Sequence, residues 1–149
     1  MDFDFTAIFH NNMLISALLS WAIAQLLKTI IYAIMNKELD FERLFGDGGM
    51  PSGHSATVTA LTVTAALEQG FDSPVFAVAF VFSIVVMHDA MGVRLEAGKH
   101  AVMLNNLFEF MDPEISPEQK LKEFLGHTPT QVVAGAVLGL VVALVFHFA

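Results

Sequence analysis

Long apolar stretches alternate with polar connectors along the whole chain. Four stretches are nearly free of charge: residues 13–35, 55–67, 75–87 and 132–148. A helix needs about 20 apolar residues to cross the hydrocarbon core of a bilayer, and the two middle stretches are short by this measure. We expect them to extend past these limits or to sit in a thinned bilayer. The pattern predicts about four transmembrane helices.

The segment 91–111 is too polar to cross lipid alone. Its apolar residues recur at helical spacing, as Val93, Ala97, Ala101, Leu104 and Phe108. This spacing predicts an amphipathic or partly inserted helix, lying at the membrane interface or packed within the bundle. The expected fold class is all-α, an integral membrane helical bundle forming a single domain over residues 1–149.

Composition agrees with a membrane protein. Hydrophobic residues make up 55% of the 149 residues and charged residues 15%, unlike a soluble globular domain. The absence of cysteine excludes thiol catalysis and a cysteine-based zinc site. A formal net charge of −8 argues against nucleic acid as a partner, because binding a phosphate backbone needs a basic surface.

Charge is divided unevenly between the two sides of the predicted bundle. With four spans, the connectors 36–52 and 88–130 share one side, and every Lys and Arg except Lys28 lies there. The positive-inside rule predicts that this side faces the cytoplasm, in the plasma or inner membrane. The acidic N-terminus gives no sign of a cleavable signal peptide.

The run 48–56, Gly-Gly-Met-Pro-Ser-Gly-His-Ser-Ala, opens the second apolar stretch. Glycine and proline favour a tight turn and close approach of the backbone to a ligand. The start of a helix offers free N–H groups and partial positive charge to an anion such as phosphate. Ser52 and Ser55 can cap the helix, and His54 can transfer a proton. A plain helix cap with an incidental histidine is the simpler alternative.

A group of polar residues is expected to converge beside this loop, namely His54, Asp89, Arg94, Lys99 and His127. Two histidines with cations and backbone N–H groups suit phosphoryl transfer without a metal or other cofactor. One imidazole attacks phosphorus and the other protonates the leaving oxygen, while the cations stabilise the equatorial oxygens. A zinc site that also uses His88 and His100 is the alternative, although the ligands lack close spacing.

Two features lie inside the apolar stretches. Lys28 shares a helix face with Gln25, and a charge at this depth usually faces a bundle interior or a polar cavity. Snorkelling toward the interface is the alternative for Lys28. Gly135 and Gly139 form a GxxxG pattern, which allows either close helix contact or a homodimer.

The motif Pro51-Ser52-Gly53-His54 is accompanied by several others: 48–52, His88-Asp89-Ala90, Gly92-Val93-Arg94, Ala97-Gly98-Lys99, Leu104-Asn105 and Leu125-Gly126-His127-Thr128-Pro129. Together they resemble the divergent branch of the type-2 phosphatidic acid phosphatase superfamily, a branch described as acid phosphatase and vanadium-haloperoxidase related. The resemblance covers nearly all of the chain, from about Gln25 to the end.

The resemblance implies roles for matching residues. His54 would be the general acid for the leaving group, and His127 the nucleophile that becomes a phosphohistidine. The superfamily has an aspartate four residues after this nucleophile, where the chain has Gln131. Gln131 can orient His127 by accepting its N–H but brings no charge, so Asp89 is an alternative source of that charge.

The same resemblance implies further roles, although this sequence differs from the superfamily's pattern at several of the positions. The superfamily's arginine is replaced by Leu121, and Arg94 is the expected substitute. The superfamily's first motif, a lysine with a following Arg-Pro, is missing from this chain. Lys37 and Arg43 are close to its spacing but lack the proline, and Lys28 is the rival lysine. The residues expected to bind the substrate phosphate are Gly49, Ser52, Gly53, Arg94, Lys28 and Lys99.

The leading hypothesis is a membrane lipid phosphatase that hydrolyses a phosphomonoester or pyrophosphate of a lipid. Phosphatidylglycerophosphate, phosphatidate and polyprenyl pyrophosphate all fit, and a cytoplasmic site favours the first. The expected partners are the bilayer and a lipid phosphate substrate. A non-catalytic lipid-phosphate-binding protein is one alternative, suggested by Gln131, and a transporter is another, suggested by Lys28 and Asp89 at membrane depth.

Overall fold

The computed structural model describes residues 5–38, 49–112, 115–116, 120–123 and 125–149. Every regular element within these residues is helical. In chain order they are the 3-10 helix η1 (Phe5–His10), α1 (Asn12–Asn36), α2 (Gly53–Gln69), α3 (Pro74–Met91), α4 (Val93–Met111) and α5 (Pro129–Phe148). The helices expected from the four apolar stretches and from segment 91–111 are therefore confirmed.

Capping residues set where the helices begin. The Asn11 side chain accepts a hydrogen bond from the Leu14 N–H (3.1 Å) at the start of α1, and Ser73 does the same for the Phe76 N–H (3.1 Å) at the start of α3. Such side chains satisfy N–H groups that a helix leaves without a partner. Polar residues just outside the apolar stretches thus cap α1 and α3.

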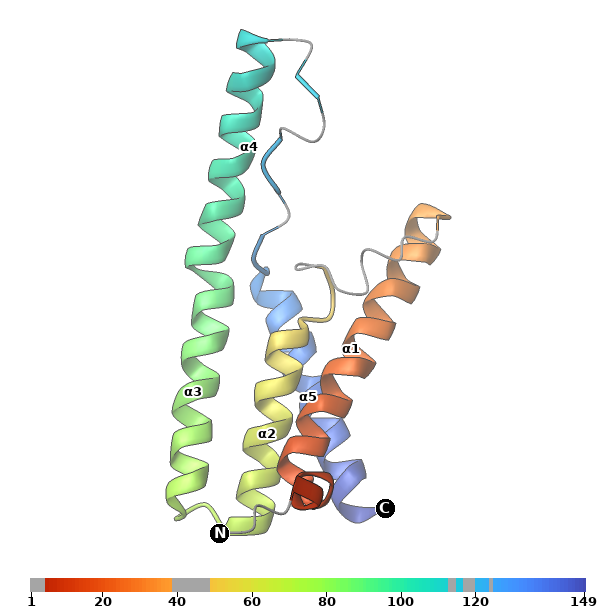
Figure 1. Cartoon of the computed structure of the whole chain (residues 1–149), viewed down its shortest axis with the longest axis vertical. Helices are drawn as coiled ribbons and strands as arrows, with labels where there is room; N and C mark the ends of the chain where they lie inside the picture. Colours follow the sequence, from red (N-terminus) through yellow and green to blue (C-terminus); the bar gives the residue numbers. More distant parts are fainter. Residues whose placement is uncertain (1–4, 39–48, 113–114, 117–119, 124) are drawn as a thin grey trace.

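Helix α2 forms the centre of the bundle and packs against α1, α3 and α5 (Figure 1). It is lined by small residues, and Ala56, Ala60 and Ala65 are completely buried. Hydroxyl groups link it to α1, since Ser16 and Thr64 share a hydrogen bond of 2.8 Å and Ser20 donates to the Ala56 carbonyl (3.1 Å). Small residues and polar links of this kind join helices that lipid surrounds.

The GxxxG pattern of α5 forms a helix contact within the chain. A Cβ atom added to Gly135 would lie 2.3 Å from the Ser52 carbonyl oxygen, and one added to Gly139 would lie 2.3 Å from that of Ala56. Only glycine permits this approach of α5 to α2. The sequence allowed Gly135 and Gly139 to serve either a close helix contact or a homodimer. The structure shows the close helix contact, between α5 and α2. A homodimer stays a separate prediction.

The outer faces of the bundle are apolar. Within the described residues, three helical runs are long and apolar enough to cross a membrane, namely Asn12–Asn36, Pro74–Met111 and Pro129–Phe148. Outward-facing side chains such as Leu18, Val78 and Val145 are more than half exposed in the isolated chain. Helix α2, with 17 residues, runs between these helices. The architecture is that of a membrane helical bundle, as the sequence predicts.

The two ends of the bundle differ in what they carry. Helix η1, the C-terminus and the turn between α2 and α3 lie at one end (Figure 1), where the Asn12 amide donates to Glu68 (2.7 Å). The start of α2 and the start of α5 lie at the other end, together with α4. This is the arrangement of connectors that four spans require.

Helix α4 is not packed within the bundle, which was one of the two placements expected for segment 91–111. It continues the direction of α3 beyond the rest of the bundle (Figure 1). A place at the membrane interface stays a prediction. The buried residues of α4 are Gly98, Ala101 and Asn105, whereas Val93 and Leu104, expected on the packed face, are 71% and 42% exposed. The cause is the chain that returns along α4, which approaches at Gly98, where an added Cβ would lie 2.7 Å from the Glu123 carbonyl oxygen.

Candidate active site

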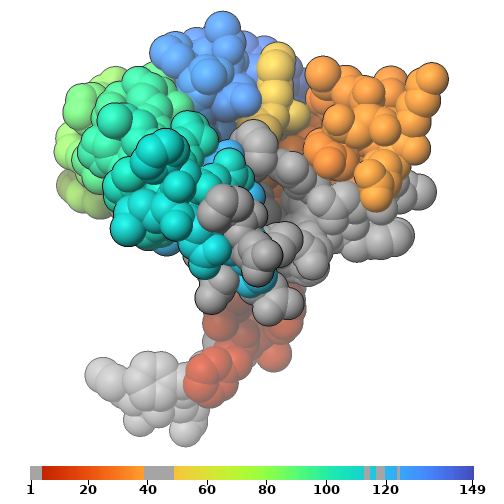
Figure 2. Space-filling view, turned by 90° about the horizontal axis from the view of Figure 1, so that it is seen from above, coloured from red at the N-terminus to blue at the C-terminus, as the bar shows by residue number. Residues whose placement is uncertain are grey.

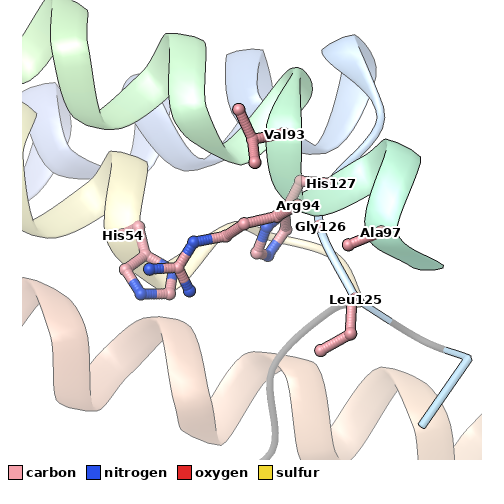
Figure 3. Close-up of a pocket in the computed structure, with 7 residues that line it drawn as sticks. All are labelled: His54, Val93, Arg94, Ala97, Leu125, Gly126 and His127. Carbon is pink, nitrogen blue, oxygen red and sulfur yellow. The ribbon is translucent and has the colours of Figure 1, made fainter. Parts of the chain in front are cut away.

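Two histidines that are distant in sequence lie side by side at the end of the bundle that carries α4. Their ring centroids are 5.9 Å apart, and the ring planes meet at 78°. His54 lies in the first turn of α2, and His127 lies two residues before Pro129, the first residue of α5. Both line a cavity of about 130 Å³ (Figure 3), completed by Val93, Arg94, Ala97, Leu125 and Gly126.

The separation of the rings falls in the range of edge-to-face contact between aromatic rings. A phosphoryl group therefore does not fit between the rings as they stand, but can reach both from the cavity beside them. His54 is partly exposed while His127 is only 2% exposed, so His54 is the ring with space to turn toward a ligand.

The position of His54 is set by the helix start to which it belongs. The Ser52 side chain caps α2 by accepting a hydrogen bond from the Ser55 N–H (3.3 Å), and it also accepts one from the Ser55 hydroxyl (3.0 Å). The Ser52 N–H donates to the Gln131 carbonyl (3.1 Å), which joins the starts of α2 and α5. The first turn of α2, with its partial positive charge, is thereby held against α5.

The position of His127 depends on the junction of α3 and α4. Its N–H donates to the Ala90 carbonyl (2.9 Å). The preceding residue, Gly126, has a φ of +80°, and an added Cβ would lie 2.3 Å from the Leu95 nitrogen. Backbone packing of this closeness leaves no room for any other residue. The junction therefore fixes the backbone from which the His127 side chain extends.

Arg94 and Asp89 form an ion pair beside the histidines. The Arg94 Nε donates to Asp89 Oδ2 (2.7 Å), and both side chains are nearly half exposed (46% and 43%). The Arg94 side chain extends from α4 toward the His54 ring (Figure 3). These two residues and His54 also line a second cavity of about 230 Å³ together with Val85, Val86 and Ala90. Arg94 and His54 therefore face both cavities.

Comparison with known proteins supports the resemblance inferred from the motifs. The family described as "Divergent PAP2 family" matches residues 9–142. The chain belongs to the Divergent PAP2 family. It is also 39% identical to a Bacillus subtilis (strain 168) protein named "Uncharacterized membrane protein YuiD", over 150 aligned residues that cover 93% of this chain and 95% of that protein. No solved structure matches the chain.

The lysine expected from the first motif of the family lies on the α1 side of the site. Lys28 is 5% exposed, and its Cγ lies 3.1 Å from the position of a Cβ added to Gly49, which has a φ of +83°. It therefore packs inside the bundle against the glycine loop and does not snorkel outward. Lys37 lies exposed at the end of α1, and Arg43 falls outside the described residues.

Three of the expected site residues, Lys99, Gln131 and Ser52, make other contacts in the structure. Lys99 lines neither cavity and pairs with Glu96 (2.7 Å) on an exposed face of α4. The Gln131 side-chain oxygen accepts a hydrogen bond from the Thr128 N–H (2.9 Å) as part of a capping box at the start of α5. Ser52, as described above, uses its oxygen to cap α2. The role of each in binding phosphate or orienting His127 stays a prediction.

The sequence motifs contain the residues that shape the wall around His127, but no role was assigned to them from the sequence. Leu125 and Gly126 line the cavity, and Asn105 secures the returning chain. Its amide donates to the Leu121 carbonyl (2.9 Å) and to Glu123 (2.8 Å), and its oxygen accepts from the Leu121 N–H (2.9 Å). A buried asparagine inside an amphipathic helix was the available signal, because such a residue needs partners.

The zinc alternative requires a cluster of donor side chains. Among the described residues, no group of three or more His, Asp or Glu side chains is arranged to hold a metal ion. His88 and His100, which the zinc alternative invoked, are both exposed. The cluster that does form is two imidazoles and a guanidinium around one cavity.

Proposed function

We propose that this protein is a membrane lipid phosphatase that hydrolyses a phosphomonoester or pyrophosphate of a lipid through His127 and His54. The observation that carries the proposal is that both imidazoles, whose centroids are 5.9 Å apart, line one cavity together with Arg94. Membership of the Divergent PAP2 family supports the same class of reaction.

In the proposed reaction, a ring nitrogen of His127 attacks phosphorus and the bond from phosphorus to the leaving oxygen breaks. The His54 imidazolium gives its proton to that oxygen, so the lipid leaves as an alcohol, or as a phosphate when the substrate is a pyrophosphate. Water then attacks the phosphohistidine and gives a proton to His54, which releases inorganic phosphate. Arg94 and the N–H groups at the start of α2 stabilise the charge on the equatorial oxygens.

The substrate is proposed to be a lipid because the site lies at one end of a bundle whose outer faces are apolar. Phosphatidylglycerophosphate, phosphatidate and polyprenyl pyrophosphate each present a phosphate at the surface of a bilayer. The excess of Lys and Arg at the site end favours a cytoplasmic site, and such a site favours phosphatidylglycerophosphate among the three.

The test is release of inorganic phosphate by the purified protein from each lipid in mixed micelles, with and without EDTA. We expect release from at least one lipid, unchanged by EDTA and inhibited by orthovanadate, which mimics pentacoordinate phosphorus. Strong loss of activity in EDTA would favour a metal-dependent reaction instead. Failure both to release phosphate from these lipids and to bind them would refute the proposal.

A second candidate function is binding of a lipid phosphate without turnover. It is favoured by Gln131, which replaces the family's aspartate and whose side-chain oxygen caps its own helix. The same assay separates the two functions when a binding measurement is added. Orthovanadate or lipid binding with phosphate release no higher than that of His127→Ala would support the non-catalytic protein.

A further inference from the structure

The amide of Gln25 differs from the other buried polar side chains of α1. Gln25 is 7% exposed, and its Oε1 has no hydrogen-bond partner within the described part of the chain. On the same helix, Ser16 bonds to Thr64 and Ser20 to the Ala56 carbonyl. A buried amide oxygen without a hydrogen-bond partner destabilises the fold. Such a group, retained in a packed bundle, indicates a ligand.

The amide faces the start of α2. Its Oε1 lies 3.7 Å from the position of a Cβ added to Gly53, and its Cδ lies 3.9 Å from the same position. Gly53 is the first residue of α2 and directly precedes His54. Lys28, on the same face of α1 as Gln25, packs against Gly49. One face of α1 therefore packs against the glycine loop at two places, with Lys28 at Gly49 and Gln25 at Gly53.

This face lies on the other side of the site from Arg94. In Figure 1 and in the end-on view of Figure 2, α1 and the α3–α4 pair lie on opposite sides of the start of α2. The partial positive charge of a helix start and the cation of Lys28 attract an anion. The amide of Gln25 adds hydrogen-bond donors through Nε2 and an acceptor through Oε1.

We propose that Gln25 is a substrate-binding residue, and that with Lys28 and the start of α2 it forms a subsite for the phosphate head group. Its Nε2 donates to a phosphoryl oxygen, and its Oε1 accepts from an oxygen of the head group that carries a proton. The inference rests on the proposed function, because it assigns a further contact to the same phosphate-bearing substrate.

The experiment uses the full chain in detergent and compares Gln25→Met and Gln25→Glu with wild type. The Kd of orthovanadate and the KM for the hydrolysed lipid are measured together with the melting temperature. For Gln25→Met we expect both constants to rise about tenfold or more, while the melting temperature is unchanged or higher. Gln25→Glu keeps an acceptor but adds negative charge, and we expect weaker vanadate binding still.

Ser20→Ala is the matched control, because Ser20 is a buried polar residue of the same helix that has a partner. We expect it to lower the melting temperature and to leave the Kd of orthovanadate unchanged. This contrast separates loss of a ligand contact from loss of a structural hydrogen bond.

Three outcomes would overturn the inference. The first is wild-type Kd and KM in Gln25→Met, and the second is a fall in its melting temperature like that of Ser20→Ala, which would assign Gln25 a structural role. The third is a wild-type protein that binds neither orthovanadate nor phosphate, which would remove the proposed function as well. Vanadate binding that is weakened in Gln25→Met, without lipid turnover in wild type, would remove only the catalytic proposal and support the subsite.

Discussion

The two walls of the candidate active site are built in different ways. The wall that carries His54 is the first turn of a helix, and a neighbouring serine in the same sequence motif caps it. The wall that carries His127 is a non-helical segment that α3 and α4 hold in place through the Ala90 carbonyl and the close approach of Gly126 to Leu95. One wall is local in sequence, and the other depends on contacts between distant segments.

This difference indicates which substitutions should affect each of the two histidines. Changes near His54 act through the start of α2, which three other helices surround. His127, in contrast, depends on residues of α4 that lie far from the cavity, because α4 supports the chain that leads to it. Remote substitutions on α4 should therefore affect chemistry at His127, whereas remote substitutions at the opposite end of the bundle should not.

The largest expected effect separates the roles of the two histidines. His127→Ala should lower turnover by about 10⁴-fold or more, because the nucleophile is lost. His54→Ala should cost about 10²–10⁴-fold with a lipid phosphate, but much less with p-nitrophenyl phosphate, whose leaving group needs no proton. Phosphate release from both esters measures this. Equal losses on both esters in His54→Ala would contradict its role as general acid.

Gly126→Ala tests the wall around His127. A methyl group would clash with the backbone of Leu95 and would also strain a left-handed conformation. Displacing His127 by about 1 Å should lower kcat/KM by about 10²-fold. Gly70→Ala is the control, since Gly70 also has a positive φ (+86°) but lies at the opposite end. It should reduce stability by about 1–3 kcal/mol and leave kcat/KM near wild type.

Asn105→Ala tests whether support by α4 reaches the site. The substitution removes three hydrogen bonds to the returning chain and should lower kcat about tenfold by loosening His127. The neighbouring Asn106→Ala is the control, because Asn106 is exposed and its loss should change stability by less than about 0.5 kcal/mol. Identical kcat in the two variants would show that the two walls respond alike.

The smallest expected effect concerns Asp89. Its half-exposed ion pair with Arg94 should contribute less than about 1 kcal/mol, so Asp89→Asn should change kcat/KM by only a few-fold. If Asp89 instead replaced the family's aspartate in orienting His127, the loss would approach about 10⁴-fold. Steady-state kinetics of Asp89→Asn, with Asp89→Glu beside it, distinguishes the two roles.

Much of the fold can be predicted from the sequence, because a helix that crosses lipid must be long and apolar. The apolar stretches are long and interrupted by polar connectors, so the number and order of the helices could be predicted. The bounds were less accurate, because caps such as Ser52 and Ser73 lie outside the apolar stretches. The path of α4 could not be predicted, since it depends on the returning chain that packs at Gly98.

The candidate active site, too, was predictable from the sequence only in part. The sequence alone determined the membrane helices, the glycine loop with His54, and the family to which the chain belongs, because these rest on local composition and short motifs. Only the tertiary structure decided that His127 contacts His54, that Lys99 lies apart, and that Gln25 faces the glycine loop. Contacts between distant segments depend on how helices pack, and helix spacing within one segment does not determine that packing.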